Sequence, residues 1–177
     1  MRWIALCLLV PLLAGCSDPP EPFLADLPRI DVQSLAYPDG KPIPVRYSCD
    51  GEGVSIPLSW QFAPQQTTHY AMIFEDPDAP GGTFTHWVWW DMPEFNRAVP
   101  SGGNVSRGGA VEGLNSAGEL GYLPVCPPEG QEHRHYASVF ALWLPLELPP
   151  TASMVEVRAA LEEKAIAKGS LMGTYAR

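Results

Sequence analysis

Hydrophobic residues recur along much of this chain with the two-residue period of β-strands. Residues 70–74 form a continuous apolar run of strand length, which predicts a central strand that is buried on both faces. Residues 85–90 alternate instead, so the even-numbered residues from His86 onward are expected on one face of a strand, with Trp87 and Trp89 on the other. Looser patterns of the same kind predict further strands at residues 30–37, 58–60 and 135–143.

One helix is predicted near the C-terminus. Ser153 and Glu156 have the spacing of a capping box, in which each side chain bonds the backbone N–H of the other residue. Apolar residues follow with helical spacing, and Gly169 has the position of a C-terminal stop. The apolar stripe consists of Met154, Val157, Leu161 and Ala165. We therefore expect a mostly β domain with one helix over about residues 153–168.

Two segments are predicted to be irregular. Residues 76–82 contain two prolines and two glycines, which interrupt the hydrogen-bond ladder of a sheet. Residues 96–131 form a long stretch that is rich in Gly, Pro and Ser. A loop of that length in a compact domain is usually functional or contains short strands of its own.

Composition and charge narrow the possible functions. The 177 residues include 16 glycines and 20 prolines, which favours a loop-rich domain over a helical bundle. With 11 Lys and Arg against 20 Asp and Glu, the net charge is −9. A protein with this negative net charge is repelled by the phosphates of nucleic acid and by anionic lipid, so we expect no nucleic-acid partner and no charge-driven membrane binding. An anionic ligand needs a local site.

The N-terminus has the pattern of a secretory signal. Arg2 is followed by an apolar run over residues 3–13, which is too short to span a bilayer. Leu13-Ala14-Gly15-Cys16 is similar to a bacterial lipobox, in which cleavage occurs before a Cys that carries lipid. We expect residues 1–15 to be a lipoprotein signal peptide and Cys16 to be lipidated with acyl chains such as palmitate. The alternative is an ordinary cleaved signal with a chance Cys.

The segment after the lipobox is expected to be a tether. Residues 16–28 are Pro-rich and acidic, which is typical of an extended linker, and residues 29–177 then form the folded domain. The protein is expected to be lipid-anchored to a bacterial membrane and to face the periplasm. Ser17 follows the Cys in place of an Asp, which in the enteric sorting pattern favours the outer membrane.

Two cysteines remain for the domain, since Cys7 lies in the signal and Cys16 is the lipid site. Cys49 and Cys126 have neither CxxC nor zinc-binding spacing, and an exported domain meets oxidising conditions. We expect a disulfide between Cys49 and Cys126. Two free buried thiols are the alternative, because spacing alone does not show that the residues are close.

Polar side chains that can form a site occur where predicted strands end or begin. Asp76 and Asp78 follow the buried strand within the Pro-rich loop. His86 opens the next strand, and His133 and His135 open another. Each has a plainer interpretation, the Asp residues as turn formers and His86 as a half-buried core residue. His133 and His135 share one strand face and could hold a metal with Asp76 or Asp78. Two His without a fixed third ligand are a weak signal, and we expect no metal.

Other motifs argue against an enzyme. Trp87, Trp89 and Trp90 are expected in the core and not as a stacking platform for a ligand. The chain contains no nucleophile elbow, zinc-protease, P-loop or dinucleotide-binding motif. We therefore expect no enzyme activity and no cofactor. A Ser–His–Asp arrangement stays open, although no particular Ser is indicated.

The chain contains a D-P-D-A-P loop that starts at Asp76, an H-W pair at His86, and a P-P-x-G-x-x-H-R segment that ends at Arg134. Together and in this order, these segments resemble the phosphatidylethanolamine-binding protein family in its bacterial Raf-kinase-inhibitor-like branch. The resemblance runs from about residue 30 to the end of the chain. It includes residues 47–51, 57–60, 76–83, 85–88, 118–122, 126–130 and 173–175.

The resemblance implies an antiparallel β-sandwich-like fold with peripheral helices and a small pocket for phosphate or a phospholipid headgroup. Carried over by position, the pocket residues are Asp76, Asp78, Pro80, His86, Pro127 and His133. The family usually has H-R-Y where this chain has His133-Arg134-His135-Tyr136. Either His135 therefore lines the pocket or Tyr136 shifts to compensate, and headgroup preference is expected to change.

An anion beside two carboxylates requires a physical explanation. Asp76 and Asp78 can orient His86 and His133 and raise the pKa values of both imidazoles. Protonated imidazoles then donate to phosphate oxygens, while an Asp meets an ammonium group. We expect non-enzymatic binding of a small anion or phospholipid headgroup by an anchored periplasmic protein. The alternatives are a protein-interaction role, such as kinase or protease inhibition through residues 96–131, and, less favoured, a hydrolase.

Overall fold

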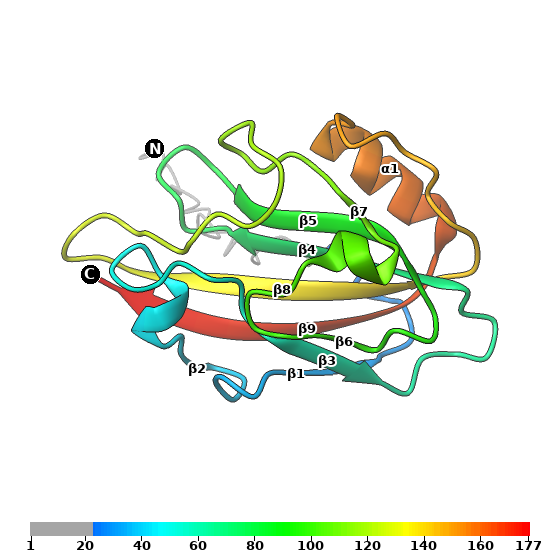
Figure 1. Cartoon of the computed structure of the whole chain (residues 1–177), viewed down its shortest axis with the longest axis horizontal. Helices are drawn as coiled ribbons and strands as arrows, with labels where there is room; N and C mark the ends of the chain where they lie inside the picture. The colour runs from blue at the N-terminus through cyan, green and yellow to red at the C-terminus, as the bar shows by residue number, and fades with distance from the viewer. Residues whose placement is uncertain (1–22) are drawn as a thin grey trace, which may run out of the picture.

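The computed structural model describes residues 23–177, and a six-stranded sheet is its main element (Figure 1). All neighbouring strands of this sheet run antiparallel except β2 and β9, which are parallel. In spatial order the strands are β2 (Lys41–Pro42), β9 (Ala165–Ala176), β8 (Glu132–Leu142), β4 (His69–Asp76), β5 (Phe84–Pro93) and β7 (Val111–Glu112).

The large sheet is covered on both faces. A three-stranded sheet of β1 (Asp31–Gln33), β3 (Leu58–Gln61) and β6 (Ala98–Val99) packs on one face, where Trp60 contacts Tyr70 and Trp89. Helix α1 (Met154–Lys164) packs on the other face through Val157 and Leu161. The fold is therefore a sandwich of two sheets with a peripheral helix, as predicted. Strand β4 is buried on both faces, also as predicted.

The C-terminal prediction is wrong in one respect. Ser153 and Glu156 form the expected capping box, but α1 ends at Lys164 and not near residue 168. The chain continues directly into β9, a twelve-residue strand that the sequence pattern did not indicate. Gly169 is not a helix stop, because it lies within β9 where a Cβ atom would collide with the backbone oxygen of Ile30.

The long segment over residues 96–131 contains short elements, which is one of the two expected outcomes. Besides β6 and β7 it includes the 3-10 helix η2 (Val105–Gly108), and a second such turn, η1 (Val45–Tyr47), precedes Cys49. Cys49 and Cys126 form a disulfide across 77 residues of sequence, which confirms that prediction. The predicted signal peptide, Cys16 and most of the tether lie outside the described residues.

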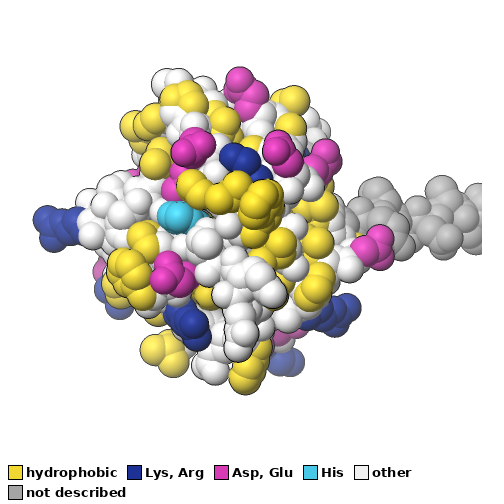
Figure 2. All heavy atoms as spheres, turned by 90° about the vertical axis from the view of Figure 1, so that its right-hand side faces the viewer, with side chains coloured by type: hydrophobic (Ala, Val, Ile, Leu, Met, Phe, Trp, Pro, Cys, Tyr) yellow, Lys and Arg dark blue, Asp and Glu magenta, His cyan; other side chains and the backbone are white. Residues whose placement is uncertain are grey.

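One end of the large sheet exposes hydrophobic side chains. Figure 2 views the end at which β4 begins and β8 finishes, where hydrophobic side chains gather between acidic and basic ones. Large exposed hydrophobic residues in the described loops of this end are Phe62, Phe95, Trp143 and Leu144. Among the described residues no helix combines the length and apolar character that a membrane span requires.

Candidate functional site

A cavity of about 260 Å³ lies at the opposite end of the sheet, where β4 ends and β5 and β8 begin. Five of the residues expected in a pocket line it, namely Asp76, Pro80, His86, Pro127 and His133. The structure thus brings together side chains from three strands and two loops that are up to 57 residues apart in sequence.

A β-bulge places His86 at this cavity. Between Phe74 and Glu75 on β4 the pairing with β5 advances by two residues, from Trp87 to Thr85. His86 is the extra residue, and its ring contacts Phe74 on the face that carries the main core. The predicted strict alternation is therefore wrong at His86, which does not share a face with the even-numbered residues that follow it.

Asp76 and His133 form a buried pair at the wall of the cavity. His133 Nδ1 donates to Asp76 Oδ2 at 2.7 Å, and both side chains are about 95% buried. The other carboxylate oxygen of Asp76 accepts the backbone N–H of Asp78 at 2.8 Å. His133 Nε2 lies 3.1 Å from Oε1 of the exposed Gln131. Asp76 thus fixes both the ring of His133 and the start of the Pro-rich loop.

His86 is held by the backbone of the facing loop. Its Nδ1 donates to the carbonyl oxygen of Leu123 at 3.1 Å, which leaves the lone pair of the neutral ring on Nε2. Burial lowers the pKa of His86 below its usual value, and the opposing influence of Asp76 is smaller. The expectation that nearby carboxylates raise this pKa is therefore wrong, because loss of solvent outweighs the charge.

His135 lies beneath the cavity and does not line it. Its side chain has no exposed surface, and neither ring nitrogen has a hydrogen-bond partner. Burial, followed by the neighbouring His86, lowers the pKa of His135 to about 4. The alternative residue Tyr136 also stays away from the cavity, since it pairs with Glu75 and Met172 on the opposite face of the sheet. Neither expected substitute for the family's aromatic residue reaches the pocket.

Three of these side chains are close enough to share an ion. One ligand atom each from Asp76, His86 and His135 lies within 4.8 Å of the other two, and all three residues are buried. The set considered from sequence was His133 and His135 with Asp76 or Asp78, so the structure keeps Asp76 and His135 and has His86 in place of His133. The bulge at His86 is what brings the third side chain into range.

Asp78 also lies outside the cavity lining. Its carboxylate binds the Arg134 guanidinium through two hydrogen bonds of 2.6 and 2.8 Å and accepts the backbone N–H of the same residue at 2.9 Å. The hydrogen bond from Arg134 lowers the pKa of Asp78 to about 2. Asp78 therefore ties the Pro-rich loop to β8 and holds the cavity wall in place.

The remaining lining residues were missed by sequence reasoning. They are mostly apolar, and the full set comprises Ala79, Phe84, Leu123, Pro124, Cys126 and Pro128. The adjacent prolines after Cys126 were the available signal, since Pro127 was expected in the pocket and its neighbours follow the same loop. The disulfide to Cys49 fixes that loop.

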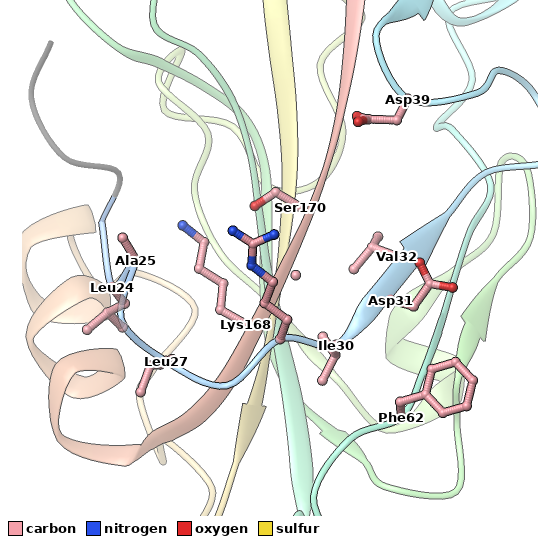
Figure 3. A pocket seen from close by; sticks show the side chains of 12 residues that line it. Leu24, Ala25, Leu27, Ile30, Asp31, Val32, Asp39, Phe62, Lys168 and Ser170 are labelled. Carbon is pink, nitrogen blue, oxygen red and sulfur yellow. The ribbon is translucent and has the colours of Figure 1, made fainter.

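A larger groove of about 600 Å³ lies elsewhere, between the start of the described chain and β9 (Figure 3). Lys168 and Ser170 project from β9 toward it, and Leu24 and Leu27 form its other side. Lys168 Nζ already donates to the Phe23 carbonyl oxygen at 2.6 Å. This groove therefore lacks the convergent buried polar side chains of the smaller cavity.

The fold and the cavity define a class of protein. It is a two-sheet β-sandwich with a small pocket at one end of its larger sheet, lined by apolar residues and by a few buried polar side chains. The family is shown by sequence. The chain belongs to the phosphatidylethanolamine-binding protein family, whose model matches residues 33–176.

Relatives and solved structures agree with this assignment. A UPF0098 protein of Methanothermobacter thermautotrophicus is 39% identical over 84% of this chain and 99% of its own length. A putative lipoprotein, LppC, of Mycobacterium tuberculosis is 34% identical over 82% of this chain and 72% of its own. A Chlamydia trachomatis homologue of the family, CT736, superposes with a TM-score of 0.79 at 35% identity over 84% of this chain and 98% of its own.

A second solved structure extends the likeness to another bacterium. YbcL of E. coli, described as a member of the mammalian family, has a TM-score of 0.77 at 27% identity and covers 84% of this chain and 99% of its own.

Proposed function

We propose that this protein binds a small phosphoryl-type group, such as phosphate or a phosphoethanolamine headgroup, in the cavity at the end of β4. It does so without catalysing a reaction on its ligand. The observation that carries the proposal is the meeting of Asp76, His86 and His133 around one proline-walled cavity. The family's name supports a headgroup as the ligand class.

The size of the cavity favours a small ligand. Its 260 Å³ lies below the roughly 300–1,000 Å³ typical of pockets for drug-sized molecules. A headgroup fits this space, whereas acyl chains would have to stay outside. The apolar wall from Pro80, Phe84 and Pro127 lowers the local dielectric, which strengthens each polar contact inside.

The polar groups suit a zwitterion. The ring of His133 is fixed by Asp76, and its other side meets only the exposed Gln131, which a ligand can displace. A phosphoryl oxygen accepts from an imidazole N–H, and an ammonium group is attracted to the Asp76 carboxylate. In this account Asp78 positions the loop through Arg134 and does not contact the ligand.

The N-terminal pattern supports a membrane-anchored location. The lipobox ending at Cys16 and the relation to a putative lipoprotein are consistent with lipid attachment and a periplasmic domain. Ser17, which follows the Cys, favours the outer membrane. Anchoring keeps such a pocket close to phospholipid headgroups.

Calorimetric titration with phosphoethanolamine tests the proposal. The wild-type chain should bind one equivalent, and Ala79→Phe, which fills the cavity and leaves Asp76 and His133 unsubstituted, should bind at least tenfold more weakly. Phe62→Ser, at the far end of the sheet, is the matched control and should keep wild-type affinity. Equal affinity in wild type and Ala79→Phe would place binding elsewhere, and no binding by wild type would refute the proposal.

A protein-interaction role is the second candidate. It is favoured by the exposed hydrophobic residues at the far end, among which Phe62 and Phe95 are 76% and 74% exposed. Surface of this kind is independent of the cavity. The Phe62→Ser control therefore also separates the two roles, because it should weaken a protein contact and leave headgroup binding unchanged.

A further inference from the structure

His135 is the buried polar group that the headgroup pocket leaves unused. Its side chain is fully covered, and both ring nitrogens lack a hydrogen-bond partner. A buried donor or acceptor without a partner costs about 1–3 kcal/mol. Such a group in a native protein therefore calls for an ion or an ordered water that satisfies it.

The surroundings of His135 favour an ion. Its Nε2 lies 3.7 Å from Asp76 Oδ2, and its ring centroid lies 5.2 Å from that of His86. In a tetrahedral site, ligand atoms about 2.1 Å from the ion lie about 3.4 Å from one another. The His135–Asp76 separation of 3.7 Å is close to this spacing. The three ligand atoms all lie within 4.8 Å of one another, so they must approach by at most about 1.4 Å to bind one ion.

We propose that Asp76, His86 and His135 bind one divalent transition-metal ion, with Zn²⁺ as the representative, at the base of the pocket. Two imidazoles and one carboxylate form a donor set that proteins use for zinc and for ferrous iron. A further coordination position faces the cavity, because His86 and Asp76 line it while His135 lies below. A phosphoryl oxygen of the headgroup occupies that position.

The outer contacts of two ligands fit a metal centre. Metal-binding histidines usually donate their second ring N–H to a carboxylate, a backbone carbonyl or water, and His86 donates to the Leu123 carbonyl. Ligating carboxylates are in turn hydrogen-bonded, as Asp76 is to His133 and to the backbone of Asp78. These contacts hold the rings and the carboxylate in place before an ion arrives.

The ion also resolves the electrostatics of the pocket. A phosphoryl group beside the Asp76 carboxylate meets repulsion, whereas a divalent cation between them attracts both. In the metal-bound form the ammonium group of the ligand therefore lies away from Asp76. This second half of the inference, the anion on the metal, rests on the proposed function. The proposed metal site does not depend on the proposed function.

Metal binding is tested on the full chain, purified in detergent and stripped with a chelator. Zn²⁺ titration of the wild type should show one site, and Co²⁺ should give visible absorption bands of a bound ion. His135→Phe, which keeps the ring volume and removes both nitrogens, should weaken Zn²⁺ at least 100-fold. His69→Phe, at the far end of β4, is the matched control and should bind as the wild type does.

Fold and metal effects are separated by thermal unfolding. Zn²⁺ should raise the unfolding midpoint of the wild type and of His69→Phe but not that of His135→Phe, since only a folded site gains from the ion. Equal Zn²⁺ affinity in wild type and His135→Phe would overturn the inference. So would the absence of Zn²⁺ binding in the wild type, which would assign the partner of His135 to an ordered water.

Phosphoethanolamine titrations with Zn²⁺ and with chelator separate this inference from the proposed function. Affinity that falls at least tenfold in chelator supports both. Equal affinity in both conditions overturns the metal-bound anion and leaves the headgroup pocket standing. Zn²⁺ binding without phosphoethanolamine binding in either condition supports the metal site and refutes the proposed function.

Discussion

The disulfide should account for a large share of the stability of this domain. Replacing Cys49 and Cys126 by Ser opens a loop of 77 residues. The chain-entropy relation for that length gives about 15 cal/mol/K, or about 4.5 kcal/mol at 25 °C. Both cysteines are exposed, so the substitution creates no buried cavity and no buried unpaired hydroxyl. The expected loss therefore comes mainly from the greater freedom of the unfolded chain.

The assay is urea unfolding of the wild type, the double variant and the reduced wild type. The two disulfide-free forms should agree with each other and lose about 4.5 kcal/mol in urea, which corresponds to about 9–18 °C in the thermal midpoint for a domain of this size. Headgroup affinity should fall as well, because Cys126 lines the cavity and the bond restrains its loop. A loss below about 1 kcal/mol would refute the entropy argument.

Three further perturbations test other parts of the fold. Gly169→Ala forces a Cβ against the backbone of Ile30, so it should cost at least about 1–3 kcal/mol in urea unfolding, and wild-type stability would contradict the crossing of β9 under the N-terminal segment. Ser153→Ala removes the α1 cap and should cost about 1 kcal/mol, whereas an unchanged unfolding midpoint would mean that the capping box is not formed in solution. Burial lowers the pKa of Lys168, so the unfolded chain keeps that proton to higher pH than the folded chain does. The stability of the wild type relative to Lys168→Met should therefore rise with pH until about pH 10.4, and parallel pH profiles of the two proteins would contradict this burial.

The sequence predicted the parts of the fold that depend on strong local patterns. The apolar run in β4 is buried on both faces, and the capping box at Ser153 is formed. Strand β9 was missed because its inward positions include Gly169 and Gly173, residues with low strand propensity. Both are required by close neighbours, and a Cβ at Gly173 would overlap Tyr37 and Ile43. Contacts of that kind depend on tertiary packing and leave no periodic signal.

The candidate site was predictable as a set of residues but not as a geometry. The resemblance supplied Asp76, His86 and His133, which the structure places around one cavity. The face of His86 was not predictable from alternation, because a bulge inserts one residue into β5. Nor was its approach to His135, since β4 lies between the strands that carry the two rings. Their side chains meet only where β4 ends at Asp76.

The most direct test of the account is a crystal structure of the protein soaked with phosphoethanolamine. The account predicts electron density for the phosphoryl group inside the cavity, within contact distance of His86 and His133. Density in the groove beside Lys168, or no bound headgroup at saturating concentration, would contradict it.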